Sequence, residues 1–94
     1  NKQFFKLDSK FKLNILWLET KLGIAIDQVQ GNEKIPLTNY FFWPKSNIWE
    51  QIKNDLDSKP WVLADEKDEI LNSIAVIMNQ WQKVVKTKTF TTTN

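Results

Sequence analysis

The feature that most constrains this fold is a change in the spacing of apolar residues at Pro44. Before Pro44, apolar side chains alternate with a period of two, as is typical of strands. After it, they recur at spacings of three and four, which is the pattern of an amphipathic helix. Pro44 lacks an amide hydrogen and restricts Trp43 to extended geometry, so a strand ends there. The first half of the chain is therefore expected to build a sheet, and the second half helices.

Two strands are predicted at residues 13–19 and 23–30. Both faces of the first are largely apolar, which indicates a central strand. The link between them is short and contains Gly23, which favours an antiparallel hairpin. We expect them to form the middle of the sheet.

A third strand is predicted at residues 38–44, TNYFFWP, where Tyr40 and Phe42 alternate with Phe41 and Trp43. Before it, residues 31–34 are polar and are expected to form a turn. Pro36 is expected to stop pairing locally. One aromatic pair should face the helices, and the pattern does not say which.

Two helices are predicted after Pro44. Asn47 followed by Glu50 resembles a capping box, and residues 58–60 should end the first helix. The second opens near Asp65, where four carboxylates suit the positive end of its dipole. The predicted buried stripes are Ile48, Trp49, Ile52 and Leu56, then Ile70, Ile74, Ile77 and Trp81, the second flanked by Leu71, Met78 and Val84 or Val85.

These elements predict an α+β domain, with a three-stranded antiparallel sheet followed by two amphipathic helices on one of its faces. We divide the chain into a basic N-terminal extension (1–12), a single α+β domain (13–85) and a C-terminal tail (86–94). Residues 87–94 are expected to be disordered or ordered only by a partner.

Charge is segregated along the chain. All thirteen cations are lysines, and the middle, residues 13–69, holds six of them against ten acids. Basic ends on a small domain are a common means of contacting phosphate. The alternative is that these lysines only keep frayed termini soluble. The candidate RNA-binding residues are Lys2, Lys6, Lys10, Lys12, Lys45, Lys83, Lys86 and Lys88.

Most catalytic chemistry is excluded by composition. The chain has no cysteine or histidine and only two glycines, so thiolate or histidine metal sites and glycine-rich phosphate loops are absent. The carboxylates Asp65, Glu66, Asp68 and Glu69 are explained by the helix dipole, and Asp27 by a hydrogen bond to backbone or a nearby lysine. We predict no enzyme activity, no metal, no cofactor and no small-molecule substrate. The apolar runs are far shorter than the roughly 20 residues of a membrane span, so no membrane partner is expected.

The aromatic stretch has two interpretations. Alternating aromatics in a small domain are more often core, yet a strand with an exposed aromatic face can stack on nucleobases or bind a protein. The candidate partner-binding residues are Tyr40, Phe41 and Trp43.

Several blocks of the sequence together resemble the plastid-specific ribosomal protein three family, found in the small ribosomal subunit of chloroplasts and in cyanobacteria. These blocks are GIAIDQV (23–29), PLTNYFFWP (36–44), Trp49, SKPW (58–61) and the ILN…NQWQ pattern of residues 70–82. The resemblance covers residues 14–82. It departs from the family around residues 30–35 and at both termini.

The resemblance implies a structural constituent of the chloroplast small (30S) subunit. Such a protein would lie in the plastid stroma and bind 16S ribosomal RNA and neighbouring ribosomal proteins. The alternative is a non-ribosomal protein–protein interaction module that uses the aromatic strand as its binding surface.

Overall fold

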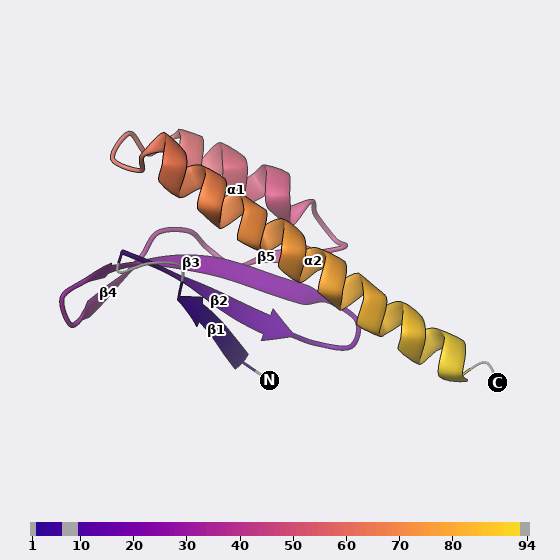
Figure 1. Ribbon diagram of the computed structural model, residues 1–94. Coiled ribbons are helices and arrows are strands. Elements are labelled where there is room, and N and C mark those ends of the chain that lie inside the picture. Colours follow the sequence, from indigo (N-terminus) through magenta and orange to yellow (C-terminus); the bar gives the residue numbers. More distant parts are fainter. Residues whose placement is uncertain (1, 7–9, 93–94) are drawn as a thin grey trace.

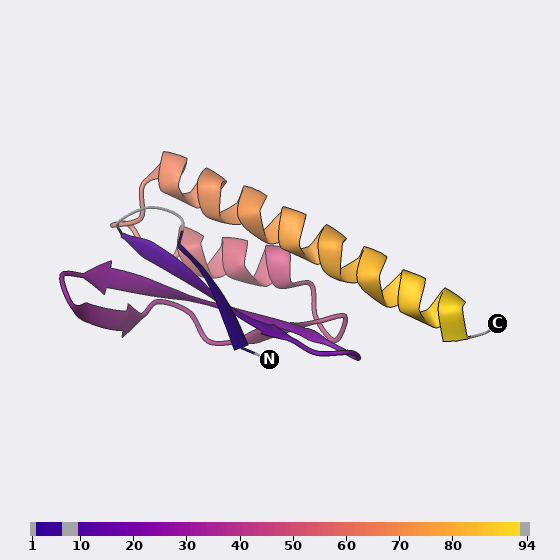
Figure 2. The same cartoon turned by 60° about the horizontal axis from the view of Figure 1, so that its bottom comes forward.

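The computed structural model describes the backbone of residues 2–6 and 10–92 and the side chains of residues 10–85. Within these ranges the chain forms five strands followed by two helices. Both helices lie against the same face of the sheet (Figures 1 and 2), which confirms the predicted α+β class. Neither helix in the described ranges is both long and apolar enough to span a membrane.

The predicted central hairpin is confirmed. Strand β2 (Phe11–Trp17) pairs antiparallel with β3 (Leu22–Gln30). Their register places Leu13 opposite Ile26 and Ile15 opposite Ile24, and all four side chains are buried. Because side chains alternate along a strand, this register places one whole face of the hairpin against the helices.

Two edge strands were missed by the sequence analysis, so the prediction of three strands is wrong. Strand β1 (Lys2–Lys6) pairs with β2, and β4 (Glu33–Pro36) pairs with β3. β4 ends at Pro36, which pairs with Asp27 as the last residue of this edge strand, so pairing stops locally as expected. An edge strand bonds on one side only, so it accommodates a proline and is often rich in lysine.

The predicted third strand is shorter than expected. Strand β5 (Phe41–Trp43) pairs with the first residues of β3, whereas β4 pairs with the last, so they follow one another along the same edge. Thr38 occupies the break between them. Its hydroxyl oxygen accepts a hydrogen bond from the Ile26 amide at 3.0 Å, and both lie in the buried interior. β5 ends at Trp43, as Pro44 predicts.

Helix α1 (Ile48–Asp57) begins as predicted, with Asn47 as its N-cap and the Asn47 side chain accepting a hydrogen bond from the Glu50 amide. Ser58 forms the C-cap, in the segment expected to end the helix. Its buried face consists of Ile48, Ile52 and Leu56, and Trp49 packs at the margin of the core.

Helix α2 (Ala64–Thr92) is much longer than its core stripe. Ile70, Ile74, Ile77 and Trp81 are buried as predicted, and Leu71 joins them. The helix continues through residues expected to be a disordered tail, and its last turns project beyond the sheet (Figure 1). Residues 1, 7–9 and 93–94 of the predicted extensions lie outside the described backbone.

Candidate functional site

The outer face of the sheet, turned away from the helices, carries a pair of aromatic rings. Phe42 pairs with Gly23, whose neighbours Leu22 and Ile24 face the helices, so the Phe42 ring lies on the outer face. Tyr40 stacks on it with the ring centroids 6.2 Å apart. Lys21 adds a cation, its Nζ 4.9 Å from the centroid of the Phe42 ring. The pair on the outer face is therefore Tyr40 and Phe42, of which Tyr40 is exposed and Phe42 half-buried.

The other two aromatics of this strand belong to the opposite side. Phe41 and Trp43 are half-buried and pack against the core beneath the helices. Of the three candidate partner-binding residues, only Tyr40 lies on the outer face. Lys21 and Phe42 were not among the candidates. The signal for Phe42 was Gly23, because a glycine within a strand often marks the close approach of another group.

Three described lysines belong to segments that lie at one end of the molecule. Lys21 lies in the turn between β2 and β3, and Lys45 follows β5, whose Trp43 pairs with Leu22 beside that turn. Lys83 lies two residues after Trp81, whose Nε1 donates a hydrogen bond to the Leu18 carbonyl oxygen at 2.8 Å, so this part of α2 lies at the same end. All three lysines are exposed, and we call them the basic end.

The remaining candidate lysines are more dispersed. Lys86 and Lys88 belong to the turns of α2 that follow Lys83. Lys2 and Lys6 lie on β1 and Lys12 on β2, along the opposite edge of the sheet from β5. Lys10 forms an ion pair with Glu66, at 3.2 Å between Nζ and Oε2. The eight candidates therefore do not form one continuous surface.

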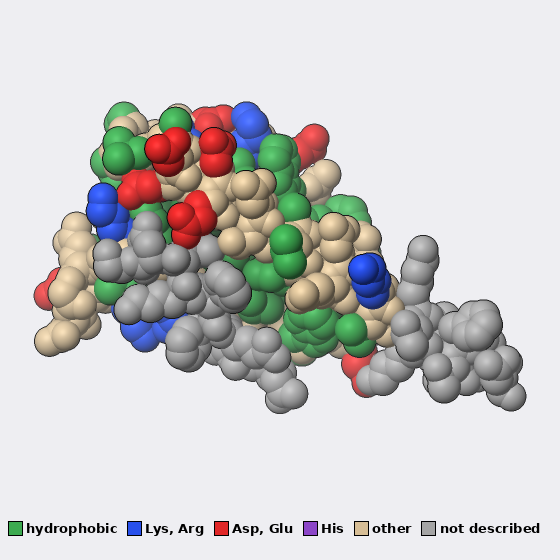
Figure 3. Space-filling model, in the orientation of Figure 1, with side chains coloured by type: hydrophobic (Ala, Val, Ile, Leu, Met, Phe, Trp, Pro, Cys, Tyr) green, Lys and Arg blue, Asp and Glu red, His purple; other side chains and the backbone are tan. Residues whose placement is uncertain are grey.

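The opposite end of the molecule is acidic. Residues 55–69 contain six acids and two lysines, and Figure 3 shows the acidic side chains gathered over the start of α2. Asp57 bridges Lys53 and Lys67, and the hydrogen bond from Lys53, followed by the charges of both lysines, lowers the pKa of the Asp57 carboxyl. Asp55 pairs with Lys59 at 2.7 Å.

Glu66, in the first turn of α2, has a structural role. Glu66 Oε1 accepts a hydrogen bond from the Leu63 amide at 2.9 Å, which caps the helix. Asp27 accepts a hydrogen bond from Asn14 Nδ2 at 2.7 Å, and Lys12 lies opposite it across the strands. Among the described residues, no group of three or more acidic side chains is arranged to hold a metal ion.

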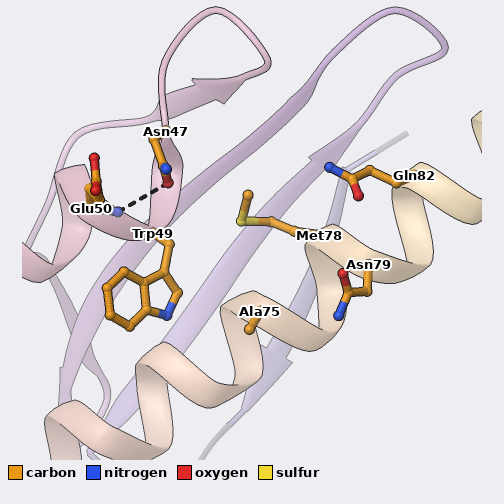
Figure 4. A pocket seen from close by; sticks show the side chains of 7 residues that line it. All are labelled: Asn47, Trp49, Glu50, Ala75, Met78, Asn79 and Gln82. Atoms are coloured by element: carbon orange, nitrogen blue, oxygen red, sulfur yellow. Dashed lines mark hydrogen bonds between the residues drawn. The ribbon is translucent and has the colours of Figure 1, made fainter.

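A shallow groove of about 290 Å³ lies between the start of α1 and the middle of α2. Trp49, Ala75 and Met78 supply its apolar surface, and neutral amides line much of the rest (Figure 4). Glu50 is its one ionisable lining residue, and its amide is held by Asn47 (Figure 4). The lining groups offer no nucleophile and no pair of acid and base for catalysis.

Comparison with known proteins identifies the class to which this arrangement belongs. Residues 37–84 match the family described as plastid and cyanobacterial ribosomal protein (PSRP-3/Ycf65). The small ribosomal subunit protein cS23 of Gracilaria tenuistipitata var. liui is 51% identical over 83% of this chain and 79% of its own length. The probable cS23 of Synechococcus sp. (strain JA-2-3B'a(2-13)) is 48% identical over 78% of this chain and 74% of its own. The cS23 of Mesostigma viride is 43% identical over 79% of this chain and 60% of its own.

These matches confirm the resemblance drawn from the sequence blocks. They also confirm the predicted localisation in the plastid ribosome, and they decide against a non-ribosomal module. The absence of a catalytic role follows from the family. The chain belongs to the plastid and cyanobacterial ribosomal protein family PSRP-3/Ycf65, as a structural constituent of the small ribosomal subunit.

Proposed function

We propose that the protein binds 16S ribosomal RNA in the small subunit chiefly through the basic end and the last turns of α2. The observation that supports this proposal is that the segments bearing Lys21, Lys45 and Lys83 lie at the same end of the molecule as the helix turns that bear Lys86 and Lys88. Each lysine that neutralises a phosphate releases condensed counterions, and this release strengthens the binding of the basic end to RNA.

The charge distribution supports one orientation over the other. Six acidic residues lie at the opposite end, in residues 55–69, where they would repel phosphate (Figure 3), whereas Glu19 is the acid of the β2–β3 turn. The net charge of the whole chain is only +2. A protein with this polarity contacts RNA with one end and leaves the other to protein or solvent. Lys6, Lys10 and Lys12 stay secondary candidates because they lie at the other end of β1 and β2, and Lys2 stays one because β1 forms the opposite edge of the sheet from β5.

The outer aromatic pair is a second element of the proposed RNA contact. Tyr40 is 36% exposed, stacks on Phe42 and lies on the same strand edge that leads to Lys45. An exposed ring beside lysines suits an unpaired base whose phosphates reach the cations. Phe41 and Trp43 support the fold in this arrangement, and Tyr40 is the member of the predicted partner-binding set that remains available.

The test is the salt dependence of binding to small subunits. Full-length protein is bound to subunits stripped of it, and the retained fraction is measured by sedimentation across a potassium chloride series. Replacing Lys45 and Lys83 by glutamine removes two proposed phosphate contacts. The slope of log K against log salt should become shallower by roughly 1.4–1.8, at 0.7–0.9 per contact.

A matched control replaces Lys53 and Lys67 by glutamine. These two lysines lie at the acidic end and both pair with Asp57. Their replacement by glutamine should leave the slope of log K against log salt unchanged. An equal change of slope in both double variants, or no change in either, would contradict RNA binding through the basic end.

A further inference from the structure

An exposed apolar surface lies at the acidic end of the molecule. Trp61 and Leu63 lie in the loop between α1 and α2, with 57% and 59% of their surfaces exposed, and Ile35 on β4 is 40% exposed. Val62, between the two loop residues, is buried and anchors the loop in the core. We call Ile35, Trp61 and Leu63 the Trp61 patch.

The patch is held in place rather than left loose. The Trp61 Nε1 donates a hydrogen bond to Gln28 Oε1 at 3.2 Å. Gln28 pairs directly with Ile35 across the strands, so it joins the two halves of the patch. The Leu63 amide is bonded to Glu66. Side chains already fixed lose less conformational entropy on binding, and exposed tryptophans are enriched among the residues that dominate protein interfaces.

The charges around the patch select the partner. Asp65, Asp68 and Glu69 follow Leu63 on the first turns of α2, all exposed, and form no ion pair within the part of the chain that the structure describes. The lysines nearest in sequence, Lys59 and Lys67, are already paired with Asp55 and Asp57. Figure 3 shows this surplus of acid beside hydrophobic side chains over the α1–α2 loop and the start of α2.

In a ribosomal subunit the available neighbours are RNA, which is polyanionic, and RNA-binding proteins, which are rich in lysine and arginine. An apolar patch rimmed by unpaired carboxylates repels the first and attracts the second. We propose that the Trp61 patch docks a lysine- or arginine-rich segment of a neighbouring ribosomal protein, with an apolar side chain of that segment seated against Trp61. This proposal rests on the small-subunit function above and names the partner class at the end away from RNA.

Photo-cross-linking from inside the subunit tests the identity of the partner. The full-length chain carries p-benzoylphenylalanine in place of Trp61, is incorporated into small subunits, irradiated and analysed by mass spectrometry. A matched probe replaces Val76, which is 55% exposed on α2 outside the patch. We expect the position-61 adduct to join a lysine- or arginine-rich peptide of another ribosomal protein. The combined variants Asp65→Asn, Asp68→Asn and Glu69→Gln should lower its yield.

Three outcomes overturn the proposal. They are an adduct between position 61 and RNA, an adduct with a second copy of this chain, and a yield at position 61 no higher than at position 76. The second copy is a real competitor, because the basic end of one molecule could reach the acidic end of another.

Binding measurements separate this proposal from the one above. Trp61→Ser with Leu63→Ser should weaken retention on small subunits about tenfold, with the slope of log K against log salt unchanged. Val76→Ser should have no effect, and thermal unfolding should be similar in all three chains. If the lysine variants alter the salt slope but the Trp61 and Leu63 variants bind normally, only the patch proposal fails. If the reverse holds, only RNA binding through the basic end fails.

Discussion

Gly23 is required by its neighbour rather than by its own backbone. A Cβ built at position 23 would lie 2.6 Å from Cε1 of the Phe42 ring and 3.3 Å from the Leu16 Cβ. Either the ring or the strand must move to admit it. We expect Gly23→Ala to lower the free energy of unfolding by about 1–3 kcal/mol, as for other overpacked sites, measured by urea denaturation.

A double-mutant cycle with Phe42 shows whether that contact is the cause. In a chain that already carries Phe42→Ala, the space over position 23 is open, and Gly23→Ala should cost much less. An alanine is otherwise no worse than glycine in a strand. The same loss in both backgrounds would mean that the constraint lies elsewhere.

Tyr40 and Trp43 lie in the same aromatic stretch of the sequence but on opposite faces of the sheet. Trp43 packs against the core, whereas Tyr40 is exposed on the outer face. We expect Trp43→Ala to lower the free energy of unfolding by somewhat less than the ~3–5 kcal/mol of a fully buried aromatic, because Trp43 is only half-buried. Tyr40→Ala should change it by about 0.5 kcal/mol and weaken subunit binding instead.

Retention on small subunits distinguishes the two roles. If Trp43→Ala left stability unchanged and abolished binding, Trp43 would be a contact residue, as the sequence first suggested. Thermal unfolding of each purified chain, measured alongside sedimentation, decides between these possibilities.

Thr38 makes the junction between β4 and β5 possible. Where the two short strands leave a gap beside β3, the Thr38 hydroxyl satisfies the Ile26 amide, and the amides of Leu37 and Thr38 both donate to the Ile26 carbonyl. Thr38→Val preserves the shape but leaves the Ile26 amide buried without a partner. The expected cost is about 1–3 kcal/mol in denaturant unfolding.

Thr38→Ser is the matched control. It keeps the hydroxyl and loses one methyl group, which costs about 0.8 kcal/mol. If the Thr38→Val variant were as stable as the Thr38→Ser variant, water would have to reach the Ile26 amide in place of the hydroxyl.

The elements that the sequence predicts well are those with local signals. The central hairpin, the strand end at Pro44 and the Asn47 cap each depend on residues only a few positions apart. Strands β1 and β4 were missed because an edge strand is defined by the strand beside it, and both are short and carry charged residues.

The site was harder to predict than the fold. Lysines could be counted, but their grouping depends on contacts such as Trp81 with Leu18, separated by 63 positions in the chain. Lys21 looked like an ordinary turn residue until that contact placed the part of α2 that bears Lys83 at the same end of the molecule. Trp61 was recognised only as part of a family motif, because exposure of an aromatic cannot be read from its neighbours in sequence.

The molecule as a whole is elongated and electrically polar. Its principal extents are 50 × 26 × 19 Å, and α2 accounts for most of the length by running past the sheet. The acids lie in the first turns of this helix, where positive backbone charge stabilises them, whereas its last turn carries no basic residue. The helix therefore stabilises the acidic end and holds it apart from the basic end.

Truncation tests whether the projecting turns serve binding rather than folding. The core stripe of α2 ends at Trp81, with Val85 packed partly against it. A chain that stops after Val85 should keep its free energy of unfolding within about 1 kcal/mol. It loses Lys86 and Lys88, so its salt slope on small subunits should be shallower by roughly 1.4–1.8.

A full-length chain with Lys86→Gln and Lys88→Gln separates charge from length. If the two lysines contact phosphate, this chain and the truncated one should show the same shallower slope, since each lacks the same two cations. If only the truncated chain binds more weakly, the projecting turns act by shape, and the RNA contact would have to be carried by Lys21, Lys45 and Lys83 alone. A truncated chain that unfolds much more easily would instead show that these turns stabilise the domain, since α2 would then depend on length beyond its core stripe.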